Sequence, residues 1–369
     1  MEITDLFRIT AEEGASDLLL TAGVPPIIRV HGELRHTDYP SLSPDEVKRL
    51  VFTLLNEKQR LDFEEDKELD FSLGVGTEHR FRVNVYYQKG SVGAAFRPIP
   101  REIPKLKSLG LPPVVYDLAL LPQGLILVTG PTGHGKSTTL ASMIDLINSN
   151  KRCHIVSIED PIEYVHQHKN SVIDQRELGG DTHSFTSALK YVLRQDPDVI
   201  LVGEMRDWET IGAALTAAET GHMVLATLHT NDAVQTIDRI IDVFPERQQQ
   251  QVRVQLSLTL LAVISQRLLP KASGNGRVLA VEILRNNHAC SALVREQKTH
   301  QLYSVIETGA KDGMMTMDAS LIRLYQRGII AREEAAQHMR NPQALIEAIG
   351  KAAEKEKNGA ERGRVISVI

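Results

Sequence analysis

The sequence predicts an α/β protein with three parts: an amino-terminal α+β domain, a core built on a parallel β-sheet, and a helical carboxyl-terminal region. Three observations lead to this prediction. Apolar and polar residues alternate with period two in the first hundred residues, most clearly along Arg80–Tyr86. From Gly124 onward, short and almost wholly apolar runs alternate with helical stretches, which is typical of parallel strands covered on both faces. After Ile283 the pattern becomes helical.

The elements follow in order along the chain. The first domain is expected over residues 1–97 and begins with a helix at Ile3–Glu13. Several prolines break any regular element over residues 98–113, which we interpret as an exposed, polar linker. The core is expected over residues 114–285, with buried strands at Leu125–Thr129, His154–Ile158, Val199–Val202 and Met223–Thr227.

The remaining residues are predicted to be helical and then irregular. The helical region is expected over residues 286–350, with its clearest helices at Met317–Arg327 and Arg332–His338. Residues 351–369 are charged and contain glycines, which is typical of a solvated tail.

The composition is that of a folded protein of more than one domain. Hydrophobic residues make up 42% of the 369 residues and charged residues 24%, which argues against a disordered, collagenous or disulfide-scaffold chain. The net charge of −5 argues against a protein whose main task is to neutralise nucleic-acid phosphates. Only Cys153 and Cys290 are present, so the chain offers neither a disulfide framework nor a four-cysteine zinc site, and it suits a reducing compartment.

No segment of the sequence predicts export or a membrane span. Charged side chains interrupt residues 1–14, so no apolar stretch of signal-peptide length is present there. The apolar stretches around residues 114–128 and 256–269 also contain polar residues. We therefore expect a cytoplasmic protein.

The strongest functional signal is a glycine-rich segment between a predicted strand and a predicted helix. Residues 130–137 read Gly-Pro-Thr-Gly-His-Gly-Lys-Ser and fit the pattern G-x-x-x-x-G-K-[ST]. Glycines let backbone N–H groups close around phosphates, Lys136 neutralises the β and γ oxygens, and Ser137 can bind Mg²⁺. The segment predicts a site for ATP and Mg²⁺, formed by Gly130, Pro131, Thr132, Gly133, His134, Gly135, Lys136, Ser137 and Thr138.

Carboxylates at the ends of two predicted strands would complete such a site. One apolar strand leads to Glu204, our candidate for the general base and a Mg²⁺ ligand. Glu159 and Glu163 follow another strand, so they would emerge at the carboxyl edge of the same sheet, where open α/β sheets bind ligands. We expect both to position metal or water, with Glu163 as a metal ligand. The alternative is a surface loop in which Asp160-Pro161 only ends the strand.

Two histidines flank the predicted strand that begins at Met223. His229 follows this strand and could sense a γ-phosphate, because imidazole donates a hydrogen bond and titrates near neutrality. His222 precedes it. We predict catalytic roles for both, the alternative being that each is an ordinary packed or solvent-facing histidine.

Five segments, in a fixed order, resemble the pilus-retraction ATPases of the type II/IV secretion ATPase superfamily. They are an amino-terminal signature at residues 15–26, a Walker A box at 130–137, an Asp box at 158–164, a Walker B box at 196–207 and a His box at 220–229. The resemblance covers nearly the whole chain.

This resemblance implies a fold, an assembly and an activity. The fold would be a PAS-like amino-terminal domain followed by a RecA-like core, in a homohexamer that binds ATP between the two domains. Two arginines of the first domain reach the γ-phosphate in related ATPases, and their spacing matches Arg82 and Arg97, which would otherwise be surface charges. The implied activity is ATP hydrolysis that powers pilus retraction and twitching motility. Its implied setting is the cytoplasmic face of the inner membrane, with a pilus platform protein as partner and no nucleic acid.

The chain departs from the family pattern at two places. His134 stands where Walker A boxes usually have a small residue, although its backbone N–H can still face phosphate. The family's retraction motif reads Ala-Ile-Arg-Asn-Leu-Ile-Arg-Glu, whereas residues 289–296 read Ala-Cys-Ser-Ala-Leu-Val-Arg-Glu.

Two alternative functions therefore stay open, that of an accessory pilus ATPase and that of a secretion ATPase, although the secretion relatives generally carry a tetracysteine site that this chain cannot build. A RecA-like nucleic-acid motor is a further alternative, which the 5% aromatic content disfavours.

Overall fold

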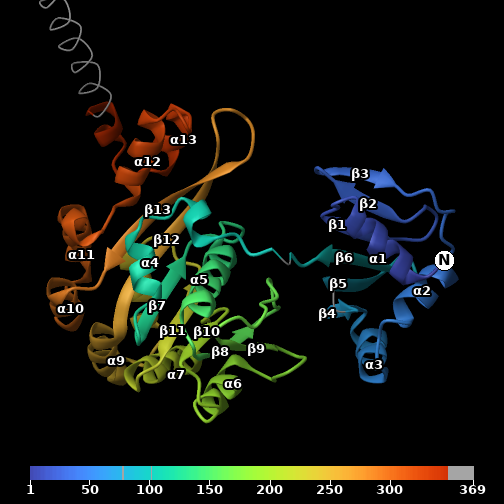
Figure 1. Ribbon diagram of the computed structural model, residues 1–369, viewed down its shortest axis with the longest axis horizontal. Coiled ribbons are helices and arrows are strands. Elements are labelled where there is room, and N and C mark those ends of the chain that lie inside the picture. The colour runs from blue at the N-terminus through green and yellow to red at the C-terminus, as the bar shows by residue number, and fades with distance from the viewer. Residues whose placement is uncertain (77–78, 101, 348–369) are drawn as a thin grey trace, which may run out of the picture. The chain divides into compact units, whose positions relative to one another are not determined.

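The computed structural model describes residues 1–76, 79–100 and 102–347 (Figure 1). The chain forms two compact units. The first unit consists of Met1–Ile103, Glu159–Gln167 and Gln175–Ser184. The second consists of Pro104–Ile158, His168–Asp174 and the chain from Phe185 onward.

The first unit is built on an antiparallel sheet of six strands in the order β3-β2-β1-β6-β5-β4. Phe81, Val83 and Val85 are buried along β5 while Arg82 between them is exposed, so the predicted alternation is confirmed. The strands and helices are β1 (Asp17–Leu20), β2 (Ile27–Val30), β3 (Glu33–His36), β4 (Glu68–Val75), β5 (His79–Gln88), β6 (Ser91–Pro98), α1 (Ile3–Glu12), α2 (Pro44–Phe52) and α3 (Glu57–Asp66).

The predicted helix at the start of the chain is confirmed as α1. Its apolar side faces the sheet, where Phe7 stacks on Phe81 with ring centroids 4.4 Å apart. Helix α2 begins where the Ser43 and Glu46 side chains cap each other's backbone N–H groups, which stabilises the first turn. These contacts give the first unit a hydrophobic core of its own.

The second unit is built on a seven-stranded sheet in the order β13-β12-β7-β11-β10-β8-β9. Strands β12, β7, β11, β10 and β8 run parallel, and β13 pairs antiparallel with β12. The four predicted buried strands are confirmed to within one residue, whereas the long β12–β13 hairpin was not predicted. The strands are β7 (Gly124–Thr129), β8 (His154–Glu159), β9 (Val172–Glu177), β10 (Val199–Val202), β11 (Met223–Leu228), β12 (Leu260–Pro270) and β13 (Arg277–Arg285).

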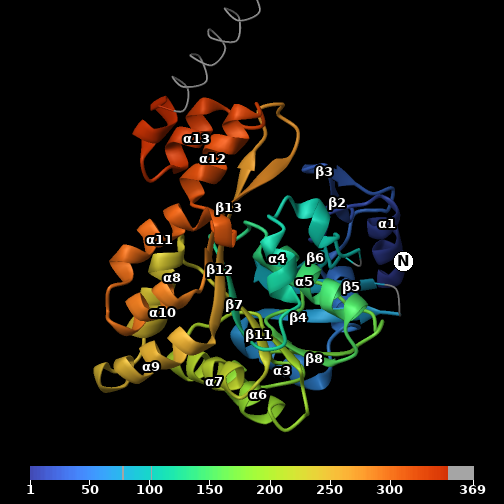
Figure 2. The same cartoon turned by 60° about the vertical axis from the view of Figure 1, so that its left-hand side comes forward.

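Helices cover both faces of this sheet, as the apolar strands predicted (Figure 2). Alternate residues of β7 point to opposite faces: Leu125 and Leu127 enter one core, Ile126 and Val128 the other. One face is covered by α4 (Val114–Ala119) and α5 (Lys136–Asn150). The other is covered by α6 (Phe185–Val192), α7 (Trp208–Glu219), α8 (Ala233–Asp242), α9 (Glu246–Thr259), α10 (His288–Arg295) and α11 (Leu302–Thr308).

The predicted carboxyl-terminal helices are confirmed as α12 (Met317–Gln326) and α13 (Arg332–His338). They share a small hydrophobic core with Leu269 of β12 and Ala280 of β13. The tail expected at residues 351–369 lies outside the described residues. Among the described residues, no helix is long and apolar enough to cross a membrane.

The proline-rich segment over residues 98–113 is less exposed than expected. Beyond the end of β6 at Pro98, regular structure among its described residues is limited to one 3-10 turn, η1 (Leu106–Leu109), because the prolines interrupt helix and strand alike. Leu106 and Leu111 are nevertheless buried beside the helices α4 and α5. The prediction of a linker exposed throughout is therefore wrong at these two apolar residues, which belong to the core of the second unit, and at Ile99, which is also buried.

Candidate nucleotide-binding site

The glycine-rich segment forms a loop between β7 and α5. Strand β7 ends at Thr129, and α5 begins at Lys136 with Gly135 as its N-cap at φ +84°. Gly130 has φ +136°, and a Cβ atom there would lie 2.3 Å from the carbonyl oxygen of Gln266 on β12. Glycine is therefore the residue that fits at this position. The amino-terminal N–H groups of α5 and its helix dipole face the loop and favour an anion there.

Lys136 is buried beneath the same loop. Its Nζ donates to the carbonyl oxygens of Gly130 at 2.8 Å and Pro131 at 3.0 Å. Nζ also lies 3.3 Å from Nδ1 of His229, on the loop that follows β11. The ammonium group is thus held at the centre of the loop, where phosphate oxygens would be stronger acceptors than neutral carbonyls.

His229 connects this lysine to Glu204. Its Nε2 lies 3.2 Å from Oε1 of Glu204, which follows β10. Because Lys136 can only donate to Nδ1, the imidazole carries its proton on Nε2 and donates it to the carboxylate. Thr132 Oγ1 also lies 3.4 Å from Nδ1 of His229. The structure therefore brings together Thr132, Lys136, Glu204 and His229, which the sequence predicted from three separate segments.

Neighbouring side chains keep Glu204 ionised. Partial burial raises the pKa of this carboxyl, but the hydrogen bonds from Arg206 and His229 and the charge of Arg206 outweigh it, so the pKa lies below its ordinary value. Arg206 Nη2 donates to Oε2 at 2.8 Å. Glu204 is therefore available as a proton acceptor near neutral pH.

His222 lies at the opposite end of β11 from His229. Its Nδ1 donates to the carbonyl oxygen of Ala217 at 2.9 Å, and its own carbonyl oxygen accepts from the backbone N–H of Gly124. These bonds tie the end of α7 to the start of β7 at the amino edge of the sheet. The structure does not bring His222 to the cluster around Lys136, and its catalytic role stays a prediction.

We expect different effects from the two histidine substitutions. His229→Ala removes the hydrogen-bond donor to Glu204 and should lower kcat for ATP hydrolysis by about tenfold to a hundredfold. His229→Gln, whose amide nitrogen can take the place of Nε2, should restore part of that loss. His222→Ala tests the other prediction, because a catalytic role would lower kcat, whereas loss of the bond to Ala217 alone would lower thermal stability. An unchanged kcat in His229→Ala would contradict the role of His229.

The two other predicted carboxylates belong to the first unit. Glu159 is the last residue of β8, and its Oε1 accepts from Nε2 of Gln175 at 3.1 Å. Glu163 is exposed. Their roles in positioning water or metal stay predictions.

Arg82 and Arg97 lie directly opposite each other on β5 and β6 of the first unit. Both are exposed on the same face of the sheet. Arg97 donates from Nε and Nη2 to Oδ1 of Asp17 at 3.0 and 2.9 Å, and Arg29 lies 3.4 Å from the other oxygen of the same carboxylate. The sheet thus presents two guanidinium groups side by side, which suits the binding of a multiply charged anion.

The second unit fits a nucleotide carried with Mg²⁺. Only glycine fits at position 130 of the loop, and the ammonium group of Lys136 lies inside the loop at the first turn of α5, as a phosphate cradle requires. Among the described residues, no group of three or more His, Cys, Asp or Glu side chains could hold a metal by itself. Mg²⁺ usually binds through one or two protein oxygens together with substrate phosphates, and Ser137 and Glu204 are the residues that would supply them.

Sequence reasoning missed two residues that shape this site. Arg206 donates a hydrogen bond to Glu204. The sequence pointed to this arginine only through its position two residues after the candidate base. Gln266 places its carbonyl oxygen against Gly130 and its side-chain amide near His134. No local sequence pattern predicts that Gln266 contacts the glycine-rich loop, because the two are distant in the sequence.

Comparisons with known proteins agree with this geometry. The family model described as "Type II/IV secretion system protein" matches residues 106–361. The type IV pilus retractation ATPase PilT of Pseudomonas aeruginosa is 50% identical over 343 residues, which are 93% of this chain and 99% of that protein. The type IV pilus ATPase PilU of the same organism is 45% identical over 92% of this chain and 88% of its own length.

A solved structure gives the same result for the fold. The crystal structure of the pilus retraction motor PilT with bound ADP has a TM-score of 0.88 and 52% identity, and the match covers 94% of this chain and 99% of that one. The geometry around Lys136 and Glu204 agrees with this similarity, which extends along almost the whole chain. This chain therefore belongs to the type II/IV secretion system protein family.

Proposed function

We propose that this chain is the ATP-hydrolysing motor that drives retraction of type IV pili and thereby twitching motility. The observation that carries the proposal is the cluster of Lys136, His229 and Glu204, found in a chain that is similar to PilT over 93% of its length. The chain is an ATPase, as its relatives are named.

The proposed reaction is attack of a water molecule on the γ-phosphate of ATP. Lys136 and the amides that open α5 would bind the β and γ phosphates. Glu204 would accept the proton of the attacking water, and His229 would hold the carboxylate by donating to it from Nε2. Mg²⁺, held by the phosphates with Ser137 and Glu204, would neutralise developing charge. Glu159 and Glu163 would assist in positioning water and metal.

We further propose a homohexamer in which a PAS-like first unit and a RecA-like core act together. Arg82 and Arg97 support this assembly, because a pair of exposed guanidinium groups on one sheet face fits a γ-phosphate. Light scattering in the presence of ATP and Mg²⁺ should then give six times the monomer mass. A fully active monomer would contradict the hexamer.

The setting that fits this function is the cytoplasmic face of the inner membrane, against the pilus platform protein. The altered motif at residues 289–296 lies on α10, where Ser291 Oγ donates to the carbonyl oxygen of Ser257 on α9 at 2.8 Å. Helix α10 follows Arg285, which pairs with Ala262 near the start of β12, so the motif lies at the sheet edge away from the phosphate-binding loop. We propose that the exposed residues of this motif contact the partner. An accessory pilus ATPase is the second candidate, because residues 289–296 depart from the family's retraction motif.

A deletion and complementation experiment tests the proposed function. Cells that lack this chain should be hyperpiliated and non-motile if it drives retraction, and the wild-type chain should restore twitching. Bald cells would indicate extension instead. Normal piliation with reduced twitching under load would indicate the accessory role.

A further inference from the structure

His134 ties the phosphate-binding loop to β12. Its Nδ1 accepts a hydrogen bond from the backbone N–H of Leu268 at 2.9 Å, and its carbonyl oxygen lies 3.4 Å from Nε2 of Gln266. The pairing of β12 with β7 ends at Ser265, so His134 provides an acceptor for a backbone N–H beyond the ladder. A small residue at this position could not reach it.

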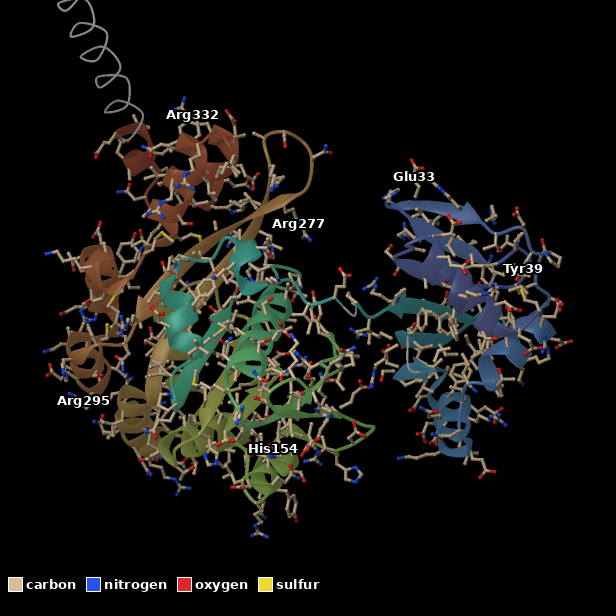
Figure 3. The ribbon with its side chains drawn as sticks, in the orientation of Figure 1. Glu33, Tyr39, His154, Arg277, Arg295 and Arg332 are labelled. Atoms are coloured by element: carbon tan, nitrogen blue, oxygen red, sulfur yellow. The ribbon has the colours of Figure 1, made fainter. Side chains whose placement is uncertain are left out.

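The imidazole is suited to accept this bond. Burial lowers the pKa of His134, and the charges of Arg267, Lys136 and Arg277 lower it further, so the ring is neutral and Nδ1 keeps its lone pair. Arg277, which extends from β13 in Figure 3, also places Nη1 3.3 Å from the carbonyl oxygen of Gly133. Two adjacent residues of the loop are therefore held by the hairpin.

The same strand also contacts the carboxyl-terminal helices. Alternate residues of a strand point to opposite faces, and Gln266 and Leu268 lie toward the loop. From the other face, Arg267 Nη1 donates to Nδ1 of His338 on α13 at 2.8 Å. Leu269 is buried in the core that α12 and α13 form. Four consecutive residues thus join the phosphate-binding loop to the carboxyl-terminal helices.

We propose that His134 is a positioning residue, which fixes the phosphate-binding loop on β12, and that β12 links the loop to α13 through Arg267. The proposal rests on the proposed nucleotide site, since the loop it fixes is the one expected to bind ATP. The motor's carboxyl-terminal helices then share in setting the affinity for nucleotide.

Two substitutions separate this role from simple packing. His134→Ala removes the acceptor, whereas His134→Asn keeps an acceptor oxygen near the position of Nδ1. In the alanine variant the Kd for a fluorescent ADP analogue should rise roughly two- to tenfold, the worth of one hydrogen bond, and KM for ATP should rise more than kcat falls. His134→Asn should bind close to wild type. His300→Ala, at an exposed histidine, is the control.

Amide hydrogen exchange tests the contact without nucleotide. The Leu268 N–H should exchange about tenfold faster in His134→Ala and stay protected in His134→Asn. If Leu268 behaves this way but no variant binds nucleotide, the proposed function fails and the positioning of the loop stands. Equal exchange and equal Kd in the alanine and asparagine variants would overturn the role of His134.

The link to α13 has its own test. His338→Phe removes the acceptor for Arg267, and we expect a smaller rise in Kd than with His134→Ala. In the double variant the two effects should not add, because both act on the same strand. Strictly additive effects, or no effect of His338→Phe in a folded protein, would limit the role of His134 to the loop.

Discussion

Glu204→Gln is expected to lower kcat for ATP hydrolysis by about two to four orders of magnitude while leaving nucleotide binding close to wild type. The amide fills the same space and can still accept from Arg206, which contacts Oε2 at 2.8 Å in the native protein. It cannot accept a proton from water, because an amide oxygen is far less basic than a carboxylate. Single-turnover hydrolysis, measured beside the Kd for ADP, separates the two steps.

The matched control for this substitution is Glu65→Gln, at an exposed glutamate of α3. It removes the same charge far along the chain from the nucleotide loop and should leave both quantities unchanged. Undiminished hydrolysis by Glu204→Gln would remove this residue from the role of general base. A large loss of ADP binding would instead indicate that the carboxylate serves chiefly to hold the metal.

Lys136→Ala is expected to weaken nucleotide binding by about a hundredfold and so to abolish hydrolysis at ordinary ATP concentrations. The native ammonium group is held by two carbonyl oxygens of the loop, at 2.8 and 3.0 Å, and these acceptors would lose their donor. The loss therefore combines the missing charge with a less ordered loop. Calorimetric titration with ADP and Mg²⁺ measures it directly.

The control is Lys190→Ala, at an exposed lysine of α6. Thermal unfolding of both variants distinguishes a misfolded protein from one that has lost only affinity. A folded Lys136→Ala protein with native ADP affinity would contradict the assignment of the phosphate site.

Much of the second unit could be predicted from the sequence because its strands are buried on both faces. Four continuous apolar runs became β7, β8, β10 and β11, and the residues after three of them met at one edge of the sheet. Parallel strands make this outcome general, since their carboxyl ends share an edge. His229 could be placed for this reason.

The rest depended on contacts between distant segments. Strand β12 carries polar residues, Gln266 and Arg267, in the middle of an apolar stretch, because one faces the phosphate loop and the other faces His338. Because polar residues interrupt the apolar stretch, the sequence did not predict the β12–β13 hairpin. His222 shows the converse: its position in a motif suggested catalysis, but the direction of β11 puts it at the amino edge.

The packing of the fold requires Gly130, and this requirement is independent of ATP hydrolysis. A side chain at this position would meet the carbonyl oxygen of Gln266 at 2.3 Å, whether or not a nucleotide is ever bound. A descendant of this chain that had lost hydrolysis would still be obliged to keep the glycine in order to fold. A glycine at this position in a paralogue therefore indicates only that the fold is shared. Retention of Lys136 and Glu204 distinguishes a paralogue that hydrolyses ATP from one that has lost this activity.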